Sequence, residues 1–401
     1  MNKPDAIAAD ATENVVHWQR FSVPYEYPVI FSRDIFSPFS SVLSDVLARA
    51  EPAKTHRCLV FIDGGLLTAA PSFADRVRQW FNANAPHVEL AVEPITILGG
   101  EAIKQDPAHF EEVQSAIHRH GIDRHSYVIA IGGGAVLDAV GLGAAVAHRG
   151  VRHVRVPTTV LSQNDSGVGV KNAVNLKGIK NFTGTFAPPW AVINDSDFLS
   201  SLPRRERISG IAEAVKVALI RDRKFFEWLE ENVGRLAEFE REAEEHMVRR
   251  CAQLHMDQIA NGGDPFERGS ARPLDFGHWV AHKLEILSEH EVNHGEAVAI
   301  GIALDVRYSV LAGFLRAGAE KRVAAVLKQL GLRLFHPALL KPGPDGRPAL
   351  LAGLDEFRQH LGGELTVTLL EDLGRGIEVH EIKEDLVLDA LRWLEGQEGA
   401  Q

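Results

Sequence analysis

The stretch SYVIAIGGGAVLDAVG (residues 126–141) joins a short apolar run to three consecutive glycines, and a helix-compatible segment follows. Because glycine has no side chain, Gly133 and Gly134 would let the backbone approach a pyrophosphate, and a helix N-terminus favours its negative charge. The stretch has neither the GxGxxG spacing nor a following GK[ST]. It therefore predicts a strand–turn–helix unit, and a dinucleotide site and a plain tight turn both remain open.

The segments around this unit alternate between apolar runs and amphipathic helical patterns. We expect edge strands within 15–36, buried strands at 57–65, 90–98, 126–131, near 154 and at 190–195, and helices at 41–50, 74–84 and 107–120. This alternation predicts a doubly wound α/β domain over residues 1–202, with ligands at the carboxyl ends of its strands. The polar segment 157–189 is expected to be a functional or disordered loop.

Helical periodicity dominates the second half of the chain. Helices are expected near 206–221, 224–236, 240–261, 275–289, 295–313, 319–330 and 382–395, with a small β element at 364–370. The pattern predicts a mostly α-helical domain over residues 203–401.

Composition limits the classes of partner. The 401 residues carry 43 Lys and Arg against 54 Asp and Glu, a formal net charge of −11, which disfavours nucleic acid. A local basic pocket for a small anionic substrate is compatible with this balance. The two cysteines, Cys58 and Cys251, lack metal-ligand spacing, and neither a signal peptide nor a membrane-length apolar run is seen. A cytoplasmic protein without a membrane partner is therefore expected.

A histidine cluster lies in RPLDFGHWVAHKLEILSEHEVNHGEAVAIG (residues 272–301). His278 and His282 are four residues apart in a helical pattern and so share a face, and His294 begins a second apolar helical pattern. Two imidazoles and a carboxylate are a usual ligand set for a catalytic zinc. Ordinary core or surface histidines are the alternative.

A glutamate that could complete this set lies in GIAEAVK (residues 210–216). Glu213 stands among small and apolar residues, where its charge is costly unless it is paired or bound to a metal. A surface ion pair with Lys216, three residues later, is the alternative.

The polar segment 157–189 carries lysines and amides that suit a phosphate or a phosphorylated sugar, namely Lys171, Asn175, Lys180 and Asn181, and it also carries Asp165. Solvated loop lysines are the alternative interpretation of the same pattern. The glycines of the segment and the pair Thr158-Thr159 favour the binding role.

Taken in chain order, these motifs resemble the 3-dehydroquinate synthase-like sugar phosphate cyclases. The shared order is GGGAVLD, PTT, Asp–x5–Lys, KN, GxAExxK, GHxxxH and HGE, and the likeness runs from about residue 63 to 370. It implies an N-terminal Rossmann-like nucleotide-binding α/β domain, a C-terminal helical metal domain, bound NAD, one Zn²⁺ or Co²⁺, and a homodimer. It also implies a reaction of oxidation by NAD⁺, phosphate loss, hydride return and intramolecular aldol closure.

The resemblance also assigns roles to residues of this chain. The metal-ligand positions are Glu213, His278 and His294. The nucleotide positions are Asp63, Glu101, Lys104, Gly133, Gly134 and Asp138, with further cofactor and substrate contacts at Thr158, Thr159, Lys171 and Lys180. The substrate-site positions are Asp165, Asn181, Lys216 and His282, and Arg149 matches an arginine that reaches the neighbouring subunit's substrate phosphate.

The chain departs from 3-dehydroquinate synthases where the substrate carboxylate is expected to bind. Those enzymes read GLRALLNFGHTxGHA, whereas this chain reads GSARPLDFGHWVAHK (residues 269–283). Ala271 replaces the expected arginine, and Arg272 lies one position away. Asp275 replaces an asparagine and puts a negative charge where a carboxylate would dock. The DKK motif near the C-terminus is also missing, with Arg358 or His360 as stand-ins.

These departures favour a substrate without a carboxylate. GGDPFE (262–267) and the FRxHLGG tail are more similar to cyclases that convert sedoheptulose 7-phosphate to valiolone-type C7 cyclitols, and His282 is closer to the 2-epi-valiolone branch. Three alternatives remain: 3-dehydroquinate synthase itself with Arg272 or another cation on the carboxylate, a glycerol-type metal-dependent alcohol dehydrogenase, and a non-enzymatic binding module.

Overall fold

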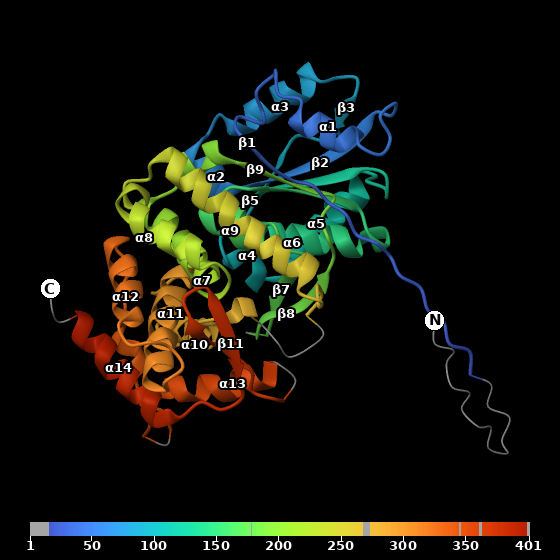
Figure 1. Cartoon of the computed structure of the whole chain (residues 1–401). Coiled ribbons are helices and arrows are strands. Elements are labelled where there is room, and N and C mark those ends of the chain that lie inside the picture. The colour runs from blue at the N-terminus through green and yellow to red at the C-terminus, as the bar shows by residue number, and fades with distance from the viewer. Residues whose placement is uncertain (1–15, 178, 268–272, 345, 361–362, 399–401) are drawn as a thin grey trace, which may run out of the picture.

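A seven-stranded parallel sheet forms the core of the first half of the chain in this computed structural model (Figure 1). The structure describes residues 16–177, 179–267, 273–344, 346–360 and 363–398. The strands are β1 (Val29–Ser32), β2 (His56–Asp63), β3 (Val88–Leu90), β4 (Ile95–Ile97), β5 (Tyr127–Gly132), β6 (Arg152–Pro157) and β9 (Ala191–Asp195).

The strand order places a crevice at the carboxyl ends of β2 and β5. The order is β1-β9-β6-β5-β2-β3, with β4 also paired to β2. The chain therefore leaves β2 toward one edge of the sheet and then crosses back to β5 on the other side. In such sheets ligands bind where the connections diverge. Here that point carries Asp63 at the end of β2 and the glycines 132–134 at the end of β5.

Helices cover both faces of the sheet, which explains why its strands are apolar along their length. Cys58, Val60 and Ile62 of β2 face one core, and Leu59 and Phe61 face the other. The first core includes α1 (Val42–Ala48) and α3 (Phe73–Ala83), and the second includes α5 (Pro107–Arg119) and α6 (Gly134–Val146). Two short helices, α2 (Gly64–Ala69) and α4 (Ala102–Gln105), were not expected.

Two sequence predictions in this half were wrong in detail. The strand expected at 90–98 is split into β3 and β4, and Pro94, which lacks an N–H group, lies in the break. Of the edge strands expected within 15–36, the described residues 16–36 form only β1. It lies at the sheet edge, as predicted, beside β9.

The polar segment 157–189 was expected to be a loop, but it contains a hairpin of β7 (Lys171–Leu176) and β8 (Ile179–Phe186). Some of its inward-facing positions are asparagines rather than aliphatic residues, so the sequence lacks the alternation of apolar and polar residues that usually predicts a strand. The buried Asn172 accepts a hydrogen bond from the guanidinium of Arg155 at 2.7 Å and donates one to the carbonyl of Ala187 at 3.1 Å. A π-helical turn at Ser162–Ser166 precedes the hairpin.

The second half is mostly helical, as predicted, and packs around its own apolar core (Figure 1, lower left). Its helices are α7 (Arg204–Arg221), α8 (Arg223–Ala237), α9 (Arg241–Asn261), α10 (His278–Leu287), α11 (His294–Leu311), α12 (Ala319–Gln329), α13 (Ala352–His360) and α14 (Glu384–Glu398). A hairpin of β10 (Val367–Asp372) and β11 (Arg375–Val379) interrupts them. No helix in the described part of the chain is both long and apolar enough to span a bilayer.

Candidate metal and nucleotide site

Three side chains from three helices meet in the helical half of the molecule. Glu213 of α7 is fully buried, and its Oε1 atom lies 3.8 Å from Nε2 of His278 and 3.7 Å from Nε2 of His294. One ligand atom from each residue lies within 4.8 Å of the other two. Oε1 accepts no hydrogen bond from any described residue. An unsatisfied buried carboxylate oxygen facing two imidazoles fits the donor set of a Zn²⁺ or Co²⁺ ion.

The starts of α10 and α11 aim the two imidazoles at Glu213. His278 and His294 are the first residues of these helices. Nδ1 of His278 lies 3.2 Å from the carbonyl of Phe276, and Nδ1 of His294 lies 2.6 Å from Oε1 of Glu285. Both rings therefore keep Nε2 for the shared centre. Burial and the nearby Lys216 hold the pKa of His278 well below its usual range, so this ring is neutral, as a metal ligand must be.

Glu285 is a site residue that the sequence analysis missed. It lies in α10, is largely buried, and its Oε2 atom accepts a hydrogen bond from Nζ of Lys180 at 2.8 Å. Its two oxygens thus connect His294 to a lysine of β8 in the other half of the chain. In sequence, a glutamate in an amphipathic helix is typical of a solvated face, and only the fold brings its partners to it.

A charged group lies beside the three candidate ligands. Nζ of Lys216 contacts Oε2 of Glu213 and lies 3.9 Å from Asp165, whose Oδ1 is 2.8 Å from Nδ1 of His255. Burial alone would lower the pKa of Lys216, but the two carboxylates outweigh this and raise it. For Asp165, burial opposes the charge, yet Lys216 and His255 together hold its pKa well below the usual range. Lys216 is therefore protonated and Asp165 ionised at neutral pH, whereas burial raises the pKa of Glu213.

His282 and Asp275 lie next to this set. The His282 ring is 5.4 Å from the His278 ring and 6.0 Å from the His294 ring, between centroids, but its nitrogens do not join the group of candidate ligands. Asp275 ends a short 3-10 helix, Pro273–Asp275, and its charge acts on both Lys216 and His282. Ala271 and Arg272 lie outside the described residues.

The hairpin and the loop before it supply the remaining predicted substrate residues. Lys171 is 56% exposed and pairs with Glu267 at 2.6 Å. Asn181 is exposed, has a positive φ of 56°, and donates its backbone N–H to the side chain of Asn175 at 2.8 Å.

Arg149 is exposed at the end of the turn after α6, and no described residue forms an ion pair with it. Its reach toward a second subunit remains a prediction.

The C-terminal stand-ins receive no support from the geometry. Arg358 pairs with Asp355 one turn earlier on α13 at 3.0 Å and is half exposed. The side chain of His360 lies outside what the structure describes.

The crevice at the end of β2 contains a cleft of 550 Å³ lined by Asp63, Gly64, Gly65, Thr96, Ile97, Leu98, Gly99 and Gly100. Oδ1 of Asp63 caps α2 by accepting the N–H of Gly65 at 2.7 Å. A Cβ atom on Gly99 would lie 2.1 Å from this oxygen, so only glycine leaves the Asp63 carboxylate in place. A carboxylate at the end of this strand, beside glycine-lined backbone, suits the ribose of a nucleotide.

The other predicted nucleotide residues surround the adjoining turn at the end of β5. Lys104 is buried and pairs with Asp138 of α6 at 2.8 Å, so these two contact each other. Glu101 precedes α4 and is exposed. The backbone N–H of Thr158 donates to the carbonyl of Gly132 at 3.0 Å, which ties the end of β6 to the end of β5.

Gly134 leaves the N-terminus of α6 open to a ligand, because any side chain at this position would meet a neighbouring residue. A Cβ atom on Gly134 would lie 2.5 Å from Oγ of Ser166, a buried hydroxyl without a hydrogen-bond partner among the described residues. The side chain of Thr159 instead bonds Ser162 at 2.8 Å. The turn therefore combines free helix N–H groups with an unsatisfied hydroxyl, which fits a pyrophosphate.

Gly99→Ala is expected to weaken NAD binding about 10-fold, because it displaces the Asp63 carboxylate and a charged hydrogen bond contributes roughly 1.5 kcal/mol. Titration of the nucleotide-free protein with NAD measures the change. Gly100→Ala is the matched control, since a Cβ there meets no atom within 4 Å and only its positive φ of 70° adds strain. Equal NAD affinity in the two variants would contradict the role of Asp63.

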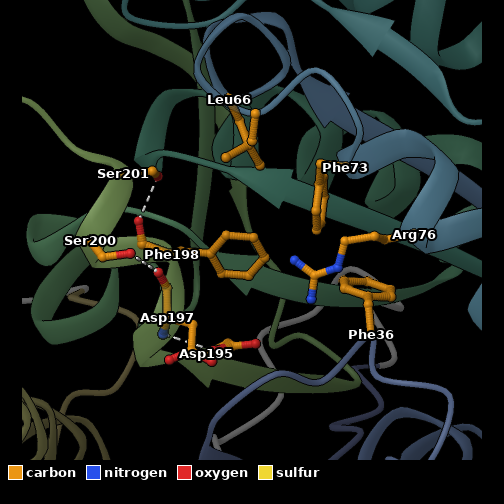
Figure 2. A pocket seen from close by; sticks show the side chains of 10 residues that line it. Phe36, Leu66, Phe73, Arg76, Asp195, Asp197, Phe198, Ser200 and Ser201 are labelled. Atoms are coloured by element: carbon orange, nitrogen blue, oxygen red, sulfur yellow. Dashed lines mark hydrogen bonds between the residues drawn. The ribbon is translucent and has the colours of Figure 1, made fainter.

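A separate cavity of 190 Å³ lies between α3 and the 3-10 helix Ser196–Ser201, and Figure 2 shows the side chains that line it. Its apolar lining includes Phe36, Phe73 and Phe198, and its polar groups already have protein partners. Arg76 pairs with Asp34, and Asp197 pairs with Arg241. Ser200 donates to the backbone carbonyl of Asp197. We assign no ligand to it.

Comparison with known proteins shows one family along most of the chain. Models of the 3-dehydroquinate synthase N-terminal and C-terminal regions match residues 94–209 and 210–342. The chain is 36% identical over 325 residues to a 3-dehydroquinate synthase of Halorhodospira halophila, covering 81% of this chain and 87% of that protein. It is 33% identical over 368 residues to a 2-epi-5-epi-valiolone synthase of Streptomyces glaucescens, covering 92% and 90%.

A solved structure shares the architecture. It is ValA, a 2-epi-5-epi-valiolone synthase from Streptomyces hygroscopicus subsp. jinggangensis 5008 with NAD⁺ and Zn²⁺ bound. The TM-score is 0.81 at 27% sequence identity, and the match covers 95% of this chain and all of that one. The combination of a nucleotide-type α/β half and a helical half is therefore confirmed.

Proposed function

Because this chain belongs to the 3-dehydroquinate synthase family, we propose that it is a phosphate-eliminating cyclase that converts sedoheptulose 7-phosphate to a valiolone-type C7 cyclitol. The relatives include both a 3-dehydroquinate synthase and a valiolone synthase, so membership of the family leaves the substrate open. The observation that carries our choice is the pairing of charges around Glu213.

The three lysines that are predicted to contact the substrate each already face a carboxylate. The pairs are Lys171 with Glu267, Lys180 with Glu285, and Lys216 with Glu213. Asp165 and Asp275 add two more negative charges near Lys216. Among the residues that the structure describes, none of these three lysines is a surplus cation for a substrate carboxylate. Arg149 of a second copy would supply the cation for a single phosphate, which matches a sugar phosphate with no other anionic group.

The residues present fit both groups that such a reaction needs. Glu213, His278 and His294 would hold one Zn²⁺ or Co²⁺, and the cleft at Asp63 with the glycine turn before α6 would hold NAD. When bound, the metal would polarise the substrate oxygens, and NAD⁺ would accept a hydride and return it.

The chain's own side chains supply the remaining chemistry. Lys216 stays protonated because two carboxylates raise its pKa, so it can donate a hydrogen bond to a substrate oxygen on which negative charge develops. His282 lies beside the candidate ligands and can exchange a proton with a substrate hydroxyl. Lys171 is exposed and would exchange Glu267 for the departing phosphate, together with Arg149 of a second copy.

The second candidate is 3-dehydroquinate synthase itself. It needs a cation for the substrate carboxylate, and Arg272, the nearest candidate in sequence, lies outside the described residues. A glycerol-type dehydrogenase is third, because the Asp–x5–Lys and KN motifs suit a phosphorylated substrate and argue against it.

Phosphate release from two substrates tests the choice. Full-length protein with Zn²⁺ or Co²⁺ and NAD is given sedoheptulose 7-phosphate or the shikimate-pathway heptulosonate 7-phosphate in parallel. We expect kcat/KM to favour the first by at least about 100-fold, since a carboxylate beside Asp275 without a cation costs on the order of 3 kcal/mol. Asp275→Asn should narrow this ratio. Preferential release from the heptulosonate would overturn the proposed substrate.

A further inference from the structure

The first turn of α10 receives its cap from another helix. Gly277 precedes α10 with a positive φ of 79°, and it has no side chain to cap the helix. Asp305 of α11 supplies the cap, since its Oδ2 atom accepts the N–H of Gly277 at 3.0 Å. Its Oδ1 atom accepts Nε1–H of Trp279 at 3.0 Å. One carboxylate therefore holds the residues on both sides of His278.

This contact is tight and buried. A Cβ atom on Gly301 would lie 2.0 Å from the carbonyl oxygen of Gly277, so the start of α10 lies directly against the backbone of α11. Asp305 follows Gly301 by one helical turn and is 1% exposed. A carboxylate is costly in such surroundings, and burial raises the pKa of Asp305 to about 7, although the hydrogen bonds that its oxygens accept from Trp279 and Gly277 oppose this rise.

We propose that Asp305 is a positioning residue that sets the angle at which His278 faces Glu213 and His294, an inference that rests on the proposed metal centre. The two ligand helices are then joined by reciprocal carboxylates. Glu285 of α10 orients His294 at the start of α11, and Asp305 of α11 orients His278 at the start of α10. Partners of this kind tune metal affinity without touching the metal.

Replacing one carboxylate oxygen of Asp305 by an NH₂ group should reveal this positioning role. In Asp305→Asn, the amide NH₂ must oppose either the N–H of Gly277 or the indole N–H of Trp279, because both are donors. We expect Co²⁺ affinity to fall about 10- to 100-fold, the usual effect of losing such a partner. Trp279→Phe keeps the carboxylate and removes one bond, so its loss should be smaller.

The double variant provides the sharpest comparison. With Trp279→Phe present, the amide oxygen introduced by Asp305→Asn would be free to accept the Gly277 N–H. The double variant, Asp305→Asn with Trp279→Phe, should therefore bind Co²⁺ more tightly than Asp305→Asn alone. Ser309→Ala is the matched control. Its hydroxyl is also buried on α11, where it accepts the backbone N–H of Leu370 and donates to the backbone carbonyl of Asp305 at 2.6 Å, but it bonds neither the Asp305 carboxylate nor a described residue of α10.

The experiment is a Co²⁺ titration of metal-free, full-length protein, with the visible ligand-field spectrum and the free energy of unfolding measured for each variant. Weaker Co²⁺ binding and an altered spectrum in Asp305→Asn, partial recovery in the double variant and wild-type binding in Ser309→Ala would support the proposal. Wild-type affinity and spectrum in Asp305→Asn, with only a loss of stability like that of Ser309→Ala, would overturn it. If the wild-type chain itself binds no Co²⁺, the proposed metal centre fails, and this inference fails with it.

Discussion

Glu213→Gln is expected to abolish tight metal binding and to lower kcat/KM by at least about 1,000-fold, because the metal supplies on the order of 4 kcal/mol of stabilisation to the developing charge. The substitution keeps the shape of the side chain and removes its charge. The Oε1 atom of Glu213 is the point on which both imidazole Nε2 atoms converge, so a neutral amide leaves the metal without its anionic ligand.

Thermal unfolding with and without metal provides the measurement. A metal that binds only the folded state raises the wild-type midpoint by mass action, and the midpoint of Glu213→Gln should not respond. Glu244→Gln is the control. Glu244 lies in α9, is also buried, and pairs at 2.6 Å with Arg207, which belongs to α7 like Glu213. That variant should lose some stability but retain the metal response. An equal metal-induced shift in Glu213→Gln would contradict its role as a ligand.

Lys216→Met is expected to have the second largest effect, with kcat lowered about 100- to 1,000-fold through loss of a charge-stabilising donor. The metal-free protein should also lose about 3–5 kcal/mol of stability, the usual cost of removing one partner of a buried ion pair. Glu213 and Asp165 then face each other without the cation between them.

The effect of added metal on the stability of Lys216→Met tests the same pairing of Lys216 with Glu213. A divalent ion restores positive charge beside Glu213, so added metal should stabilise Lys216→Met by more than it stabilises the wild type. NAD affinity should not change, because Asp63 and the glycine turn belong to a different part of the molecule. Near-wild-type turnover would show that Lys216 does not act on the substrate.

The sequence predicted the parts of the fold in which local pattern and burial agree. The strands β2 and β5 contain continuous apolar runs because both faces of the sheet are covered, and the aspartate and glycine at their ends mark the crevice. The hairpin of β7 and β8 could not be predicted in this way. Its inward Asn172 is satisfied by Arg155, a partner 17 residues earlier in the chain.

The candidate ligands could likewise be predicted from local sequence motifs, whereas the residues that orient them could not. Glu213, His278 and His294 stand in recognisable motifs, whereas Glu285 and Asp305 look like ordinary polar residues of helices. Their roles depend on the crossing of α10 and α11, which places Glu285 on His294 and Asp305 on both neighbours of His278. No spacing along the chain encodes that contact, since it arises from packing at Gly277 and Gly301.

The most direct test of the central claim is to follow inorganic phosphate and NADH together while metal- and NAD-loaded protein acts on sedoheptulose 7-phosphate. A cyclase returns the hydride in every cycle, so we predict many equivalents of phosphate per protein with no net accumulation of NADH and with a carbocyclic product. Accumulation of NADH in step with substrate consumption, without phosphate release, would contradict the account and would identify a dehydrogenase instead.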